Sequence, residues 1–151
     1  MDDEEKLVFI RCFDAPQELL FRCMTEKEHL THFWGPKGMT TPIDSIVVDL
    51  RPGGTFETTM VSEPDGSRYT MTAAFSEVRP PEHLAWIDAN TGVVTTATFT
   101  SLGPFRTEIE IRQTNVPEFM RSADARAGFV TSFDRFSDYL RIAGSGSEKP
   151  T

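Results

Sequence analysis

ADARAGFVTSFDRFSDYLRI, residues 123–142, is the stretch that decides the fold of this chain. Its residues Phe129, Phe133, Phe136 and Leu140 follow one another at offsets of four, three and four, so they share one face of a helix that turns every ~3.6 residues. Tyr139 lies at the edge of that face. So bulky a face needs a large apolar partner, and the only one that the sequence offers is the run of strands before it. A curved sheet around such a helix can enclose a pocket, so the pattern favours a binding cavity.

Upstream of this helix, apolar and polar residues alternate with a period of two, and turn residues such as PGG and PDG interrupt the alternation. The pattern predicts six antiparallel strands, near residues 46–50, 55–60, 69–76, 84–88, 93–100 and 105–114. Short connections favour pairing between neighbours in the sequence.

The N-terminal third predicts one further strand, residues 7–13, and two short helices, residues 17–24 and 25–33. Thr25 and Glu28 have the spacing of a capping box at the start of the second helix. The complete order indicates an α+β fold in which a curved antiparallel sheet wraps around the long C-terminal helix. We expect one domain over residues 7–142, with flexible termini at 1–6 and 143–151.

Composition excludes several classes of function. The net charge of −8 argues against nucleic-acid binding, which needs a basic patch. No run approaches the ~18 apolar residues of a membrane span, and the acidic start MDDEEK is unlike a signal peptide, so we expect no membrane insertion and a cytoplasmic location. Cys12 and Cys23 are too few for a disulfide framework and are expected to be free thiols. The three histidines have no metal-site spacing, so we expect neither a metal nor a cofactor.

Five motifs, in order along nearly the whole chain, resemble the START/Bet v 1-type (SRPBCC) superfamily, in the branch homologous to the activator of the ninety-kilodalton heat-shock-protein ATPase. They are RCFDAP (11–16), FWGP (33–36), DLRPGG (49–54), PPEHL (80–84), and residues 107–113 followed by Gly128 and the terminal helix. The resemblance implies the helix-grip fold and a hydrophobic cavity. Phe129 and Phe21 stand where this branch often has Trp, which implies a different cavity shape. Such relatives include lipid carriers, cyclases and co-chaperone domains, so the resemblance implies no single activity.

The DLRPGG motif combines a carboxylate, a guanidinium and a glycine turn, which invites a catalytic interpretation. A structural one is simpler: Gly53 or Gly54 supplies a positive φ in a hairpin, and Asp49 and Arg51 fix the turn. A strand follows the glycines rather than the helix that a phosphate-binding loop needs.

Three hypotheses from different classes follow. The first is non-enzymatic binding of a small hydrophobic or amphipathic molecule between the sheet and the C-terminal helix. Its candidate ligand-binding residues are Trp34, Phe56, Met60, Tyr69, Met71, Trp86, Phe99, Ile109, Phe129 and Phe133. The second is a co-chaperone-like protein-interaction module, which would need an exposed apolar patch for a chaperone or for a second copy of the chain.

The third hypothesis is a cyclase- or hydrolase-like enzyme that uses Tyr69, Asp88 or His83. No Ser-His-Asp order, metal cluster or carboxylate pair supports it. Cys12 has no basic neighbour beyond Arg11 to activate its thiol as a nucleophile. We therefore assign no catalytic residue from the sequence.

Overall fold

The computed structural model describes residues 6–148. Its elements, in chain order, are β1 (Leu7–Phe13), α1 (Gln17–Cys23), α2 (Lys27–Phe33), β2 (Met39–Thr40), the 3₁₀ helix η2 (Ile43–Ser45), β3 (Val47–Val48), β4 (Thr55–Ser62), β5 (Arg68–Arg79), β6 (His83–Asp88), β7 (Val94–Gly103), β8 (Arg106–Thr114), the 3₁₀ helix η3 (Glu118–Met120) and α3 (Ala123–Glu148). The predicted α+β helix-grip arrangement is confirmed.

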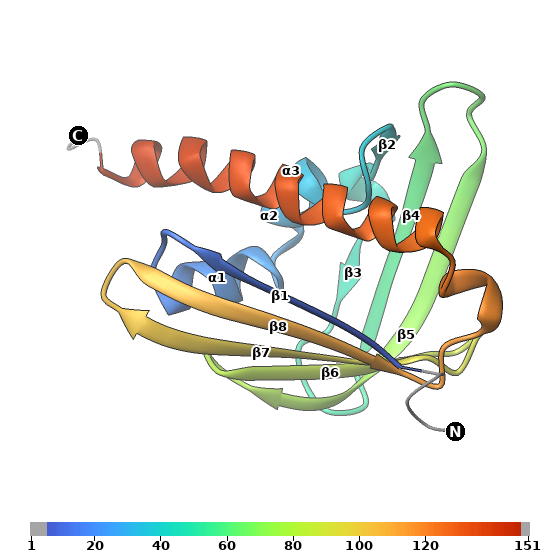
Figure 1. The fold of residues 1–151 in the computed structure, drawn as a ribbon, viewed down its shortest axis with the longest axis horizontal. Coiled ribbons are helices and arrows are strands. Elements are labelled where there is room, and N and C mark those ends of the chain that lie inside the picture. Colours follow the sequence, from blue (N-terminus) through green and yellow to red (C-terminus); the bar gives the residue numbers. More distant parts are fainter. Residues whose placement is uncertain (1–5, 149–151) are drawn as a thin grey trace.

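The strands form one curved antiparallel sheet in the order β1-β8-β7-β6-β5-β4-β2, and β3 pairs with β4 as well. Strands β4 to β8 pair with their neighbours in the sequence, as the short connections predict. The first strand pairs with the last, from Leu7 opposite Gln113 to Phe13 opposite Thr107. Figure 1 shows α3 lying over one side of this sheet, with α1 and α2 on the same side.

The core lies between that side of the sheet and the helices, because the alternation turns every second strand residue inward. Phe56, Leu84, Phe99 and Ile109 are among the buried strand residues, and Phe133, Phe136 and Leu140 are buried on α3. The helix face also packs on elements outside the predicted run of strands. Phe136 stacks on Phe33 of α2, with ring centroids 4.3 Å apart. The stripe thus packs on α2 as well as on the sheet.

The predicted strand at 46–50 is reduced to Val47–Val48. The segment before it is the 3₁₀ helix η2, in which Ser45 donates to the carbonyl of Pro42 from its amide (3.0 Å) and from its hydroxyl (2.7 Å). The same hydroxyl accepts a bond from the amide of Thr59, at 3.2 Å. A side chain therefore takes the place of a strand partner for β4 here.

Two helix boundaries differ from prediction. The hydroxyl of Thr25 donates to the carbonyl of Phe21 at 2.9 Å, so it binds the end of α1 instead of forming the expected capping box, and α2 begins at Lys27. Helix α3 runs to Glu148, six residues beyond the predicted end. A glycine inside a helix costs only about 1 kcal/mol relative to alanine, so Gly144 and Gly146 do not stop it. The remainder of the expected flexible termini, residues 1–5 and 149–151, lies outside the described residues.

The DLRPGG turn has the structural role that its residues indicate. Gly53 has a φ of +85°, and a Cβ on Gly54 would collide with the carbonyl oxygen of Asp49. The Arg51 guanidinium forms two contacts with the Asp49 carboxylate: Nε donates to Oδ1 at 3.0 Å, and Nη2 lies 2.9 Å from Oδ2. The amide of Gly53 donates to the carbonyl of Phe75 on β5 at 2.7 Å. The motif anchors a turn against the sheet.

Candidate ligand-binding site

A cavity of about 300 Å³ lies between α3 and the inner face of the sheet. Its walls come from strands β4 to β8, from the loop after α2, from Met120 of η3, and from one side of α3. Most of its lining is aromatic or aliphatic, with three methionines among the strand and loop residues (Met24, Met60 and Met71). Such a lining suits an apolar ligand, since ligand pockets are largely apolar with few polar groups.

Seven of the ten predicted ligand-binding residues line this cavity: Trp34, Met60, Met71, Trp86, Ile109, Phe129 and Phe133. Phe56 and Phe99 point inward but are packed into the core, each 1% exposed. Phe56 stacks on Phe75 at 5.2 Å, and Phe99 meets Phe21 edge-on at 5.5 Å. Their rings fill the core beside the cavity.

The expectation that Tyr69 faces the cavity is wrong, because the residue is 53% exposed and is not part of the cavity lining. Tyr69 is the second residue of β5, opposite Met60, close to the turn that joins β4 and β5. Figure 1 shows this hairpin rising past α3. Alternation predicts the correct face of β5 for Tyr69. Helix α3, however, does not cover that face at the end of the strand next to the β4–β5 turn.

Trp34, one of the predicted ligand-binding residues that line the cavity, is fastened to the sheet. Its indole Nε1 donates to the hydroxyl of Thr58 at 3.2 Å, and its ring lies 5.5 Å from Phe56 and 6.4 Å from Trp86. The same residue begins the 34–36 loop, all three residues of which line the cavity.

Arg135 of α3, which the sequence did not single out, holds this loop from the helix side. Its Nη1 lies 2.9 Å from the carbonyl oxygen of Gly35, 3.1 Å from that of Met39, 3.2 Å from that of Pro36 and 3.3 Å from that of Trp34. Burial lowers the pKa of this guanidinium. Arginine can serve several acceptors at once because its donors form a rigid fork. One side chain therefore fixes a wall of the cavity.

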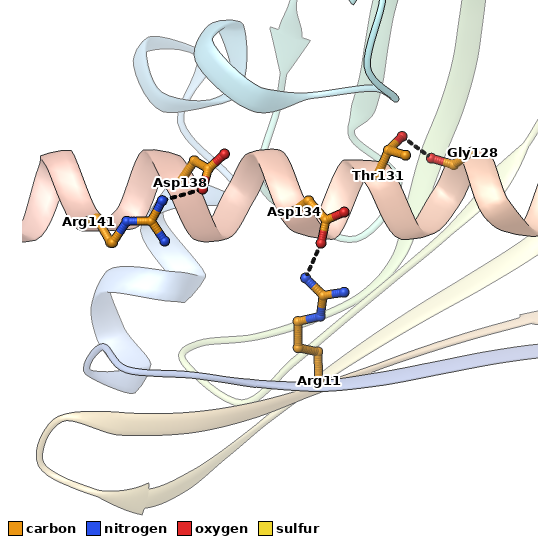
Figure 2. A network of polar contacts seen from close by, with 6 residues as sticks. All are labelled: Arg11, Gly128, Thr131, Asp134, Asp138 and Arg141. Atoms are coloured by element: carbon orange, nitrogen blue, oxygen red, sulfur yellow. Dashed lines mark hydrogen bonds and ion pairs between the residues drawn. The ribbon is translucent and has the colours of Figure 1, made fainter.

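The opposite flank of α3 is tied to β1. Figure 2 shows Arg11 of β1 reaching Asp134 of the helix, with Nη1 and Oδ1 2.8 Å apart. The Arg11 guanidinium also lies 5.3 Å from the centre of the Phe133 ring, a cation–π distance. In the same view, the Thr131 hydroxyl donates to the carbonyl of Gly128 at 2.6 Å, within the helix. Contacts on both flanks thus position the face that lines the cavity.

The candidate catalytic groups are not brought together. Asp88 lines the cavity, whereas Tyr69 is exposed. His83 lies on the other face of β6, where its Nε2 is 2.8 Å from Glu77. Cys12 is exposed, and burial raises the pKa of Cys23 to about 12, which keeps that thiol protonated. An enzyme that uses His83 would need this side chain to point inward, but Leu84 and Trp86 occupy the inward face of β6, so that part of the third hypothesis is wrong.

Within residues 6–148, no three His, Cys, Asp or Glu side chains gather in a way that could hold a metal ion. No helix of the described part of the chain is long and apolar enough to cross a membrane.

Solved structures with the same fold come from several bacteria. NE0264 from Nitrosomonas europaea is 24% identical, with a TM-score of 0.82 over 96% of this chain and 99% of that chain. CV1439 from Chromobacterium violaceum is 19% identical, with a TM-score of 0.80 over 88% of this chain and 95% of that chain. An AHSA1-like protein from Aeromonas hydrophila is 20% identical, with a TM-score of 0.78 over 92% and 94%. No curated protein matches the sequence.

The sequence itself carries the family assignment. Residues 14–141 match the family described as Activator of Hsp90 ATPase homolog 1-like protein, which confirms the resemblance that the five motifs indicate. The match covers every element from α1 to most of α3. This chain therefore belongs to the Activator of Hsp90 ATPase homolog 1-like family.

Proposed function

We propose that this protein binds a small hydrophobic or amphipathic molecule in the cavity between the sheet and α3, without converting it chemically. The observation that carries the proposal is a cavity of about 300 Å³ with a mainly apolar lining. Its volume is at the lower end of the roughly 300–1,000 Å³ that small-molecule sites span. The bonds from Arg135 and Trp34 support a wall that is already in place before a ligand arrives.

The test is a titration with N-phenyl-1-naphthylamine, an uncharged dye whose fluorescence rises in apolar surroundings. Ser132 lines the cavity from α3, and Ser137 on the same helix does not. Ser132→Phe should fill the cavity and weaken dye binding at least about tenfold, a change of 1.4 kcal/mol. Ser137→Phe places the same ring elsewhere on the helix and should leave the affinity unchanged.

Absence of dye binding to the unmodified protein would overturn the proposal. So would equal affinities for the protein and for a folded Ser132→Phe variant, because the dye would then bind outside the cavity. Thermal unfolding of each variant by circular dichroism shows whether it is folded.

The family supports a second candidate, a co-chaperone-like interaction module. The observation that favours it is the hairpin between β7 and β8, where Leu102 is 50% exposed and Phe105 is 71% exposed. Exposed apolar groups close together are typical of interaction sites. If the dye titration contradicts binding in the cavity, this hairpin is the next site to test.

A further inference from the structure

One end of the cavity carries polar side chains from three adjacent strands: Asp88 of β6, Thr95 of β7 and Gln113 of β8. Thr95 is opposite Trp86 on one side and opposite Gln113 on the other. Asp88 follows Trp86 by two residues, so it shares the same inward face and is a diagonal neighbour of Thr95. The three side chains therefore form one polar patch.

The hydrogen bonds of this patch leave acceptor atoms for a ligand. Oδ1 of Asp88 accepts bonds from the amides of Asn90 (2.8 Å) and Thr91 (3.2 Å), which hold the turn between β6 and β7 and orient the carboxylate. No donor from residues 7–142 is bonded to its other oxygen, Oδ2. Nε2 of Gln113 donates to the Thr95 hydroxyl at 3.3 Å, which leaves the amide oxygen as an acceptor. The patch thus offers a carboxylate oxygen and an amide oxygen.

Asp88 is also the one charged side chain among the described residues that line the cavity. Three arginines on elements around the cavity are bonded to other groups: Arg11 to Asp134, Arg135 to carbonyls of the loop after α2, and Arg121 to the carbonyl of Val116 at 3.1 Å. Beside an apolar volume the attraction between a carboxylate and a cation is stronger than in water, and the repulsion of an anion is stronger too. The Trp86 ring, two residues earlier on the same face, adds an aromatic surface of the kind that attracts cations.

From this arrangement we infer that the cavity selects amphipathic molecules with an amine at the polar end, and that the Asp88 carboxylate binds the ammonium group. The inference rests on the proposed function, since it names the class of ligand for the same cavity. The apolar lining receives the body of the molecule, and Gln113 accepts a further hydrogen bond from the same nitrogen. A fatty acid of equal length is disfavoured, because its carboxylate would meet that of Asp88 without a cation between them.

The experiment is displacement of N-phenyl-1-naphthylamine by decylamine, decanol and decanoate, each below its micelle-forming concentration and at physiological salt. The unmodified protein should bind decylamine at least about tenfold more tightly than decanoate, with decanol in between. Asp88→Asn keeps the Oδ1 acceptor for the two turn amides and removes the charge. It should bring the three affinities to within about a factor of two.

Asp65→Asn is the matched control. Asp65 also accepts an amide bond at a turn, from Ser67 at 3.0 Å, but it is exposed and does not line the cavity. The substitution changes the net charge of the protein by the same amount, so it reports any general attraction of amines to an acidic protein. The amine preference should survive in this variant.

The outcomes separate the two proposals. Failure of the dye to bind the unmodified protein contradicts the proposed function. Binding of the dye with equal displacement by decylamine and decanoate contradicts the inference alone, and this ranking needs no variant to fold. An amine preference that persists in Asp88→Asn, or that is lost equally in Asp65→Asn, also contradicts the inference.

Discussion

Replacing Arg135 with methionine should release the 34–36 loop from α3 and destabilise the protein. Methionine keeps an unbranched apolar stem of similar length, so most of the packing of the side chain is retained. What is lost is the guanidinium, which lies within hydrogen-bond distance of the carbonyl oxygens of Gly35, Met39 and three further residues.

The size of the effect follows from the number of donors. Nη1 has two hydrogens, and its shortest bonds, to Gly35 and Met39, are 2.9 and 3.1 Å long. A hydrogen bond to a charged group contributes about 1.5–3 kcal/mol. Because Arg135 is only partly buried, water can reach some of the released carbonyls and offset part of the loss. The free energy of unfolding should fall by about 2–3 kcal/mol, which at a urea m-value of about 2 kcal/mol/M moves the midpoint by about 1–1.5 M.

Urea unfolding followed by circular dichroism measures this loss, and dye titration measures the cavity. Arg135→Lys should recover only part of the stability, because one ammonium cannot span acceptors spread along the loop. Arg141, whose ion pair with Asp138 lies on the exposed side of the same helix, is the control. Arg141→Met should cost less than about 0.5 kcal/mol. A loss that small for Arg135→Met would refute the reasoning.

Three further predictions concern single positions. Gly54→Ala should destabilise the protein more than Gly53→Ala in urea unfolding. A Cβ at Gly54 would collide with the backbone of Asp49, whereas Gly53 has a positive φ but open space around it. Equal losses in the free energy of unfolding would contradict this. Phe136→Ala should lower the free energy of unfolding by about 3–5 kcal/mol, since Phe136 is 2% exposed and its ring is packed on α2. A loss below about 1 kcal/mol would show that the ring is not packed. At pH 8.5 iodoacetamide should label Cys12 and spare Cys23, whose thiol has a pKa raised to about 12 by burial; intact-mass measurement should find a second label only after unfolding in urea.

Local periodicity accounts for what the sequence could predict of the fold. The strands from β4 to β8 and the face of α3 follow from periods of two and 3.6, which each segment carries by itself. The pairing of β1 with β8 was not predicted, because it joins residues at opposite ends of the domain. The strand at 46–50 and the capping box at Thr25 are wrong for a related reason: the hydroxyls of Ser45 and Thr25 bond backbone groups that the local pattern does not identify.

The candidate site could likewise be predicted only as far as local periodicity identifies its residues. Alternation identifies the inward faces, so it found Trp86, Asp88 and Ile109 at the cavity. It gives no measure of how far the helix covers each strand, which is why Tyr69 was placed inside. The role of Arg135 left no signal, since its partners are backbone carbonyls about 100 positions earlier in the sequence, and any residue type supplies a carbonyl.

The pairing of β1 with β8 has a consequence for biosynthesis. Phe13 leaves the ribosome well before its partner Thr107 exists, and at roughly 5–20 residues per second the delay is about 5–20 s. During that time the nascent chain holds an unpaired strand and, until α3 emerges, an uncovered apolar sheet face, both of which promote aggregation. Synthesis that stops short of the terminal helix would leave this face permanently open. Completion of the last helix is therefore the step of synthesis that covers the apolar sheet face and removes this route to aggregation.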